Sequence, residues 1–301
     1  MIQPLPVTII GGYLGAGKTT LVNQMLRQAD GQKLAILVNE FGELPIDEDL
    51  IEAQDDELIS IAGGCICCSF GSDLNAAMLE LAKLSPRPDH VVIEASGVAL
   101  PGAIASSISL LSEFSVDGVC VLADCLTLLS QLADDYIGDT VSRQISDADL
   151  IVLSKADLVS DPQHSEVAAF LKQGWPNTRA IKAVQGRVPN AVLLGHLDPD
   201  MAEKSKSHPH LDFTSTILRF AEPVDAHALA EFLSHPQNGI VRAKGFVTDF
   251  SGQQALIQIV GPRAEVTFPN HAGSTGVVCI GQTTCFDPKV LEEWAGAAGE
   301  D

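Results

Sequence analysis

Residues 12–19 read GYLGAGKT, and they connect the apolar run LPVTII (5–10) to the helical pattern TTLVNQMLRQ (19–28). They fit the phosphate-loop pattern G-x-x-x-x-G-K-[ST] without a mismatch, between a strand and a helix as the pattern requires. Glycines allow backbone N–H groups to surround phosphate oxygens, and the positive end of the helix favours an anion. Nucleotide binding is therefore the prediction, with a chance glycine turn as the alternative. The predicted phosphate-binding residues are Gly12, Gly15, Ala16, Gly17, Lys18, Thr19 and Thr20.

Two side chains of this loop and one further segment are expected to act on the phosphates. Lys18 would reach the β- and γ-phosphates, and the Thr19 hydroxyl would bind Mg²⁺. The run HVVIEASG (90–97) leaves a strand at an acidic residue, and phosphate-loop enzymes need a carboxylate there, facing Mg²⁺. Glu94 is the candidate, acting through a water molecule, and the Gly97 amide would contact the γ-phosphate. The alternative is a solvated glutamate at a strand end.

Four more apolar runs indicate the fold class of the first two-thirds of the chain. Nearly continuous apolar runs are typical of strands covered on both faces, and such strands form parallel sheets with helices on either side. The pattern predicts a doubly wound, mostly parallel α/β domain. The runs are KLAILVN (33–39), HVVIEAS (90–96), GVCVLAD (118–124) and DLIVLSK (149–155).

A change of composition marks a predicted domain boundary. Residues 198–212, DPDMAEKSKSHPHLD, are polar, contain two prolines and show no periodicity, as is typical of a linker. We therefore expect a nucleotide-binding domain at 1–197 and a smaller α+β domain with a mostly antiparallel sheet at 213–301.

Charge and hydropathy exclude several classes of partner. The chain has 39 acidic and 18 basic side chains and a net charge of −21, so neither nucleic acid nor an anionic membrane is an expected partner. No apolar run reaches the length of about 20 residues that a membrane span needs. The start of the chain lacks the features of an export signal, and the expected location is the cytoplasm. There Cys120, Cys125, Cys279 and Cys285 are expected to be small buried side chains rather than disulfide partners.

The other three cysteines are crowded in GGCICC (63–68). Thiolates are soft ligands that select Zn²⁺, Cu⁺ or iron–sulfur chemistry, and the two preceding glycines allow the backbone to bend around one ion. Three ligands, Cys65, Cys67 and Cys68, leave the fourth tetrahedral position open, which suits an ion that must be released. The alternatives are a cluster of small core residues and a redox-active thiol pair.

An acidic loop follows the second predicted strand. NEFGELPID (39–47) contains Glu40 and Glu43, in the stretch where phosphate-loop switch proteins place their first switch. The cysteine cluster lies between this loop and Glu94, so a metal site there would be built from segments that rearrange with the γ-phosphate. Glu40 is the candidate for positioning the attacking water or the switch loop, and Glu43 is a candidate additional ligand of the transition metal.

The base of the nucleotide is expected to lie near LSKADL (153–158). Guanine-specific phosphate-loop proteins use N/T-K-x-D, in which the aspartate accepts two hydrogen bonds from the guanine edge and the lysine stem lies over the ring. Lys155 and Asp157 match this pattern, whereas Ser154 stands where asparagine is usual. The order of the motifs favours GTP over ATP. AIKAVQG (180–186) is the candidate for a final loop beside the base.

With GxxGxGKT, NEFGE, GGCICC, ExSG and KxD in this order, the chain resembles the CobW-type family of P-loop GTPases, which are regarded as metal chaperones or insertases. The similarity covers almost the whole chain, because the family also has a small C-terminal domain with an R-x-K-G segment, here at 242–245. The histidine-rich stretch of many members is reduced here to His208 and His210.

The resemblance implies Mg²⁺-dependent GTP hydrolysis coupled to delivery of a transition metal to a client metalloprotein. Zinc is the first candidate for the cargo, and Co²⁺ for the cobalamin pathway is the alternative. A nucleotide-gated module that regulates a partner without metal transfer is a second reading, and a small-molecule or nucleotide kinase is a third. A homodimer is left open. Because no arginine finger is evident, slow intrinsic turnover is expected.

Overall fold

The structure is a computed structural model that describes residues 3–38, 51–54, 58–61, 65–69, 74–195, 213–269 and 273–297. Four predictions fall outside these residues: the linker at 198–212, Glu40, Glu43, and the side chains of the C-x-C-C cysteines. The chain divides into two compact units, Met1–Pro176 with Ala180–Leu194 and Asn177–Arg179 with Gly195–Asp301. Each unit is described by itself.

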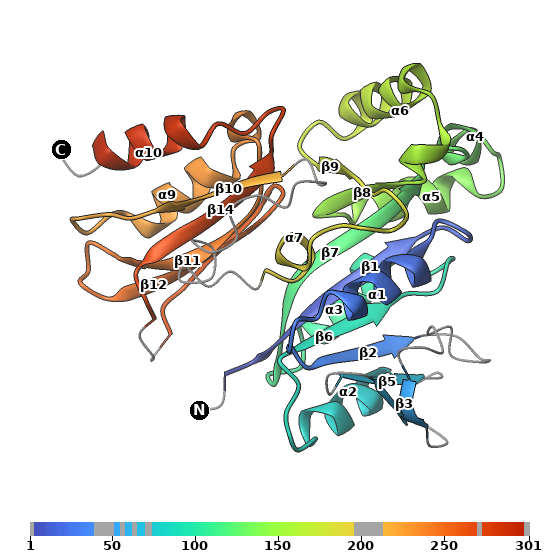
Figure 1. The fold of residues 1–301 in the computed structure, drawn as a ribbon, viewed down its shortest axis with the longest axis horizontal. Coiled ribbons are helices and arrows are strands. Elements are labelled where there is room, and N and C mark those ends of the chain that lie inside the picture. Colours follow the sequence, from blue (N-terminus) through green and yellow to red (C-terminus); the bar gives the residue numbers. More distant parts are fainter. Residues whose placement is uncertain are drawn as a thin grey trace. The chain divides into compact units, whose positions relative to one another are not determined.

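Nine strands form the larger sheet within the described residues. They are β1 (Leu5–Gly12), β2 (Leu34–Val38), β3 (Ile51–Gln54), β4 (Leu58–Ile61), β5 (Cys65–Ser69), β6 (His90–Glu94), β7 (Phe114–Asp124), β8 (Leu150–Ser154) and β9 (Arg179–Lys182). Their order across the sheet is β3-β4-β5-β2-β6-β1-β7-β8-β9 (Figure 1). The strands from β5 to β8 in this order run parallel, and β3 and β4 continue one edge in antiparallel pairing.

The parallel strands are the apolar runs that the sequence indicates. β2, β6 and β8 are buried over their whole length, because helices cover both faces of a parallel sheet. β7 begins at Phe114, before the predicted run at 118–124. The sequence pattern missed this first half because it includes the polar residues Ser115 and Asp117. The predicted doubly wound α/β fold is confirmed.

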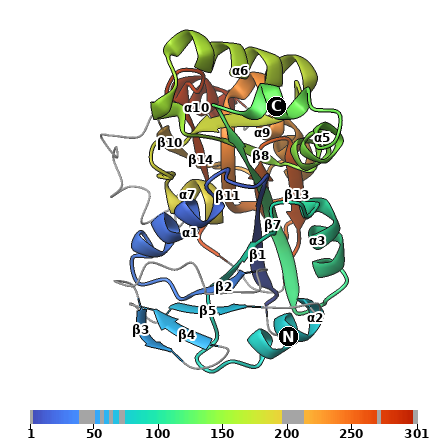
Figure 2. The same ribbon diagram turned by 90° about the vertical axis from the view of Figure 1, so that its right-hand side faces the viewer.

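Helices of the first unit pack on the two faces of this sheet. They are α1 (Lys18–Arg27), α2 (Leu74–Ala82), α3 (Pro101–Ile108), α4 (Leu128–Leu132), α5 (Gly138–Ser146), α6 (Asp161–Gly174) and α7 (Asn190–Leu194), with the 3₁₀ turn η3 (Ala156–Leu158). Figure 2 shows α1 and α7 on one face and α2, α3 and α5 on the other. On the second face, Met78 of α2 and Val141 of α5 join the core formed by Val7 and Ile9 of β1.

The second unit is built on an antiparallel sheet. Its described strands are β10 (Phe213–Leu218), β11 (Ile240–Thr248), β12 (Gln254–Val260), β13 (Arg263–Thr267) and β14 (Gly276–Gln282), in the order β10-β14-β11-β12-β13. Its helices are α9 (Ala226–Ser234) and α10 (Pro288–Ala297), with the 3₁₀ turn η4 (Pro236–Asn238). Leu229 of α9 and Leu291 of α10 pack with Ile257 and Val277 in one core. The predicted α+β class is confirmed for this unit.

The four cysteines outside the cluster differ in exposure. Cys120, Cys125 and Cys279 are buried free thiols, as expected. Cys285 is also free but exposed, so the expectation of a buried side chain is wrong there. It lies in the turn between β14 and α10, where the neighbouring Phe286 fills the core instead.

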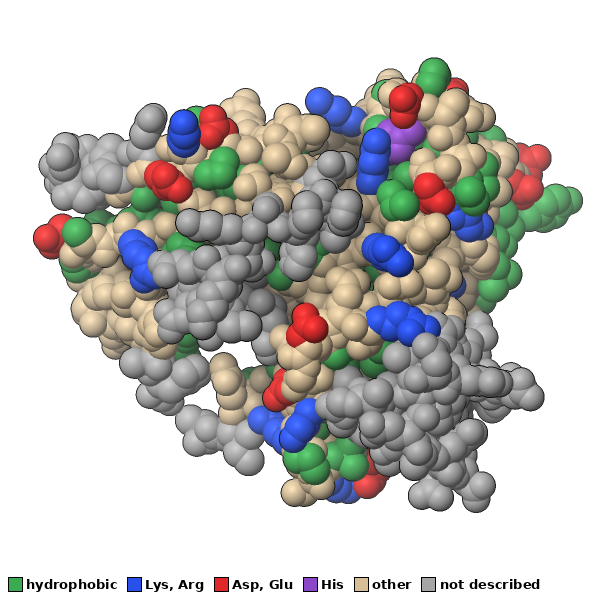
Figure 3. Space-filling view, in the orientation of Figure 1, with side chains coloured by type: hydrophobic (Ala, Val, Ile, Leu, Met, Phe, Trp, Pro, Cys, Tyr) green, Lys and Arg blue, Asp and Glu red, His purple; other side chains and the backbone are tan. Residues whose placement is uncertain are grey.

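Both signs of charge occur on one face of the molecule. Figure 3 shows Lys and Arg side chains scattered among acidic and apolar ones on the described part of the face in view. Among the described helices, none combines the length and apolar character of a membrane span.

Candidate functional site

The phosphate loop connects the end of β1 to the start of α1. Gly12, Gly15 and Gly17 have φ values of 134°, 75° and 94°, a region that L side chains adopt only with strain. A Cβ atom on Gly12 would also lie 2.6 Å from the carbonyl oxygen of Leu122 in β7. The glycine pattern of the sequence therefore meets two needs, the backbone conformation of the loop and the close approach of a neighbouring strand.

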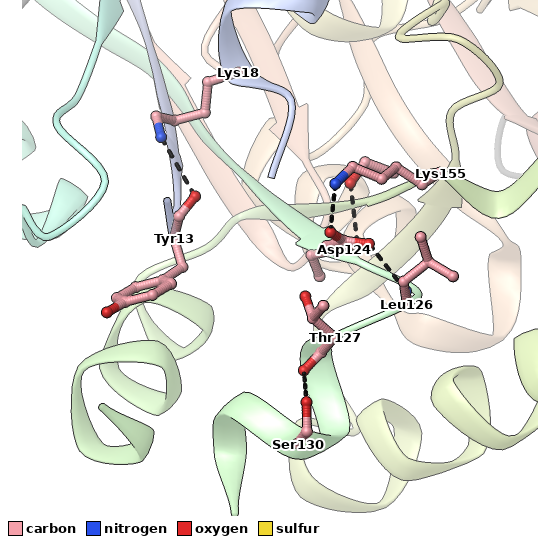
Figure 4. Close-up of polar contacts among 9 residues, drawn as sticks. Tyr13, Lys18, Asp124, Leu126, Thr127, Ser130 and Lys155 are labelled. Atoms are coloured by element: carbon pink, nitrogen blue, oxygen red, sulfur yellow. Dashed lines mark hydrogen bonds and ion pairs between the residues drawn. The ribbon is translucent and has the colours of Figure 1, made fainter. Parts of the chain in front are cut away.

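Lys18 is the first residue of α1 and is only 7% exposed. Its ammonium donates a hydrogen bond to the carbonyl oxygen of Gly12 at 3.0 Å. A second, at 3.4 Å, goes to the carbonyl oxygen of Tyr13 (Figure 4). The unpaired N–H groups of a helix N-terminus and its dipole add positive potential at the same place, and the first turn of α1 contains no acidic residue. The loop is therefore suited to bind a polyphosphate.

Glu94 ends β6 beside the phosphate loop. Its register partners are Ile10 of β1 and Val38 of β2. The Thr19 hydroxyl donates a hydrogen bond to Glu94 Oε1 at 2.8 Å, and Glu94 is 6% exposed. A hydroxyl and a carboxylate at this distance are two hard oxygen donors, so the pair fits Mg²⁺.

The loop after β6 is held against the phosphate loop. A Cβ atom on Gly97 would lie 2.9 Å from the backbone nitrogen of Leu14. Gln144 of α5, which is 1% exposed, donates from Nε2 to the carbonyl oxygens of Gly97 at 3.0 Å and Ala99 at 2.8 Å. One buried amide thus fixes the backbone that carries Gly97.

The predicted base-binding residues follow β8. Lys155 has left-handed backbone angles, φ 55° and ψ 27°, and its ammonium lies 2.7 Å from Asp124 Oδ2 at the end of β7 (Figure 4). Asp157, in η3, is exposed to solvent. After β9, Gly186 adopts φ 70° against the start of α1, where a Cβ atom would lie 2.9 Å from Thr20 Cγ2. This turn belongs to the segment predicted to lie beside the base.

Cys125 follows Asp124 directly. Its burial, and secondly the charge of Asp124, raise the pKa of the thiol to about 11. The free thiol therefore stays protonated near neutral pH.

The cysteine motif forms the backbone of β5. Cys68 pairs with Leu37 and Ser69 with Val38 in β2, and Val38 pairs in turn with Glu94 of β6. Neighbouring strands lie about 4.8 Å apart, so two strand spacings, about 10 Å, separate the end of β5 from Glu94. Within the described residues, no cluster of three or more His, Cys, Asp or Glu side chains could hold a metal ion.

Two residues of the candidate site, Asp124 and Gln144, were not predicted from the sequence. The sequence does contain an indication of Asp124, because this acidic residue ends an apolar strand just as Glu94 does. It contains none of Gln144, because a glutamine on an amphipathic helix is normally exposed. Only the packing of α5 against the loop after β6 reveals its role.

A parallel sheet whose central strand runs through a glycine loop into a helix, with a carboxylate ending the adjacent strand, defines a P-loop nucleotide-binding protein. Residues 6–181 match the family model described as CobW/HypB/UreG, nucleotide-binding domain, and residues 213–298 match that of the cobalamin synthesis protein cobW C-terminal domain. The chain belongs to the CobW/HypB/UreG family, which confirms the resemblance.

Characterised relatives share most of this length. A zinc chaperone CobW of Sinorhizobium sp. is 30% identical over 331 residues, covering 92% of each chain. The zinc chaperone YjiA of Escherichia coli is 35% identical over 271 residues, covering 82% of each. The crystal structure of Zn(II)-bound YjiA GTPase from E. coli superposes with a TM-score of 0.50 at 26% identity, over 98% of this chain and 99% of that one.

Proposed function

We propose that this protein is a cytoplasmic, Mg²⁺-dependent GTPase that binds Zn²⁺ through its C-x-C-C motif and releases it to a client metalloprotein when GTP is hydrolysed. The printed names of its relatives, zinc chaperone and YjiA GTPase, support the cargo and the nucleotide. The strand register is the observation that carries the coupling. Ser69, Val38 and Glu94 stand in one row across β5, β2 and β6, so the cysteine strand ends at the edge of the sheet where Glu94 bonds Thr19.

Hydrolysis depends on the residues around the phosphates. Lys18 neutralises charge on the β- and γ-phosphates, within a cradle formed by the backbone from Gly12 to Thr20. Thr19 and Glu94 would hold Mg²⁺, Glu94 through a water molecule, and the ion would supply charge stabilisation for the leaving phosphate. The Gly97 amide contacts the γ-phosphate while Gln144 holds its carbonyl. Glu40 positions the attacking water.

Selection of guanine falls to the segment after β8. Asp157 is exposed and can accept two hydrogen bonds from the guanine edge, while the Lys155 stem covers the ring. Adenine does not present this pair of donors, so ATP would not gain the two hydrogen bonds to Asp157.

Metal binding falls to Cys65, Cys67 and Cys68, with Glu43 as an additional ligand. Three thiolates suit Zn²⁺ and also accept Co²⁺, and the fourth tetrahedral position is left to Glu43, which a ligand of the client can replace during transfer. We assign nucleotide and metal binding to residues 1–197 and client docking to residues 213–301, joined by a linker at 198–212.

A titration of Zn²⁺ into the protein with GDP and with a non-hydrolysable GTP analogue tests the coupling. At least a tenfold difference in Zn²⁺ affinity between the two states is expected, because the ligands flank segments that respond to the γ-phosphate. Equal affinities would remove the coupling and favour a regulatory switch without metal transfer. The same titration with Co²⁺ distinguishes the two cargoes.

Cys67→Ala tests the ligands. The variant should lose more than tenfold in Zn²⁺ affinity and bind GDP as the wild type does. Cys285→Ala, which removes an exposed free thiol in the other unit, is the matched control and should change neither. Loss of GDP binding together with Zn²⁺ binding in Cys67→Ala would assign the motif a structural role instead.

A further inference from the structure

We infer that Asp124 is a positioning residue that anchors the Lys155 ammonium and thereby holds its stem over the guanine base. The inference deepens the proposed function and rests on it, because Lys155 can cover a base only if the segment after β8 binds guanine. Asp124 lies on a different strand from the N/T-K-x-D pattern, so the pattern does not include it.

The carboxylate of Asp124 is held at both oxygens. Oδ1 accepts a hydrogen bond from the backbone N–H of Leu126 at 2.9 Å, and Oδ2 lies 2.7 Å from the Lys155 ammonium (Figure 4). The Asp124 side chain is 6% exposed, whereas that of Lys155 is 35% exposed. A buried, fixed anion therefore holds the ammonium of a lysine whose side chain is about one-third exposed.

Ser154 does not supply this anchor. It is the register partner of Asp124, and its hydroxyl makes a long contact of 3.5 Å with the Ala123 carbonyl oxygen. The backbone bond from Cys125 N–H to the Ser154 carbonyl, at 3.1 Å, ties the two strand ends together. These contacts fix the backbone, and the ion pair alone among them reaches the Lys155 side chain.

The backbone at Lys155 points to the same role. Left-handed angles at a residue other than glycine are unfavourable and persist at sites where the surroundings hold them. The angles place the lysine side chain next to the end of β7 instead of continuing the strand. Without a fixed partner, a four-carbon stem loses rotamer entropy when it stacks on a base, and this loss weakens binding.

Asp124→Asn removes the charge and keeps both the size and the acceptor for the Leu126 N–H. GDP affinity, measured by calorimetry, should fall about tenfold, which corresponds to about 1.4 kcal/mol. ADP affinity should change less than twofold, because adenine does not bond Asp157 and gains little from the stem. At saturating GTP, kcat should stay within twofold while KM rises.

Asp149→Asn is the matched control. Asp149 also accepts a backbone hydrogen bond, from Val119 N–H at 2.9 Å, but it precedes β8 at the opposite end of the strand pair. The same charge change there should leave the ratio of GDP to ADP affinity unchanged. Asp124→Glu keeps the charge and displaces the anchor, and it should lower the ratio partially.

A double-mutant cycle with Lys155→Met shows whether Asp124 acts through the lysine. In the Lys155→Met background, Asp124→Asn should cause no further loss of GDP affinity. Three results would each overturn the inference. The losses of GDP affinity could be additive in the double mutant, or Asp124→Asn could leave the ratio of GDP to ADP affinity unchanged. Asp124→Asn could also lower GDP and ADP affinity equally while lowering stability. If the wild type does not prefer GDP over ADP, the proposed GTP specificity itself fails, and this result is seen before any variant is made.

Discussion

Gln144→Met should loosen the loop after β6 without changing the size of the buried side chain. Gln144 Nε2 bonds the carbonyl oxygens of Gly97 and Ala99, and methionine can replace neither bond. The buried Gly97 carbonyl would be left without a donor, which lowers the free energy of unfolding by about 2 kcal/mol. Loss of the bond to the half-buried Ala99 carbonyl lowers it by about 1 kcal/mol, because water can reach that oxygen. Gln144 Oε1 has no hydrogen-bond partner within the part of the chain that the structure describes, so its removal recovers about 1 kcal/mol of folding free energy. The net expectation is about 2 kcal/mol of destabilisation.

Urea unfolding of the full chain, with fluorescence and circular dichroism, measures this free energy. Amide hydrogen exchange at residues 95–100 reports the local effect, and it should become faster in Gln144→Met than elsewhere in the first unit. Nucleotide affinity should fall as well, because Gly97 lies against Leu14 of the phosphate loop. Gln173→Met, on the exposed face of α6, is the control and should stay within about 0.5 kcal/mol. An unfolding free energy and exchange rates equal to those of the wild type would refute the reasoning.

Three further predictions concern other parts of the molecule. Gly186→Ala should destabilise the chain by about 1–2 kcal/mol in urea unfolding, because φ is 70° and the new methyl group would meet Thr20. The same change should weaken GDP binding. An unchanged GDP affinity would show that this turn does not belong to the nucleotide site. Burial, and secondly the charge of a nearby lysine, lower the pKa of His164, so the unfolded chain binds more protons below pH about 6.5 and stability should decrease as the pH falls through that value. His164→Gln should flatten this part of the stability–pH curve, and a curve identical to the wild type would contradict the assignment. At pH 8, iodoacetamide should label the exposed Cys285 before Cys125, whose pKa is about 11, and peptide mass mapping that finds the reverse order would contradict the burial.

The phosphate loop, Lys18, Thr19 and Glu94 follow from the sequence because each is encoded locally. The glycine spacing specifies backbone angles within one loop, and the apolar run of β6 ends at Glu94, the residue that accepts the hydrogen bond from Thr19. The fold class follows for the same reason, since continuous apolar runs of strand length report burial on both faces. The start of β7 was less predictable because its first half includes polar residues. The exposure of Cys285 was less predictable because a single residue type does not reveal which side of a turn fills the core.

The sequence by itself therefore determined the nucleotide-binding class and the parallel sheet, and it supplied the cysteine cluster on which the proposed metal site rests. Only the tertiary structure decided that Asp124 meets Lys155, that Gln144 reaches Gly97, and that the end of β5 stands in register with Glu94. The Asp124–Lys155 and Gln144–Gly97 contacts join residues that are 31 or more positions apart in the chain. The alignment of the end of β5 with Glu94 depends on the order of the strands across the sheet. Strand order and register arise from the packing of whole elements, and no local pattern of side chains encodes them.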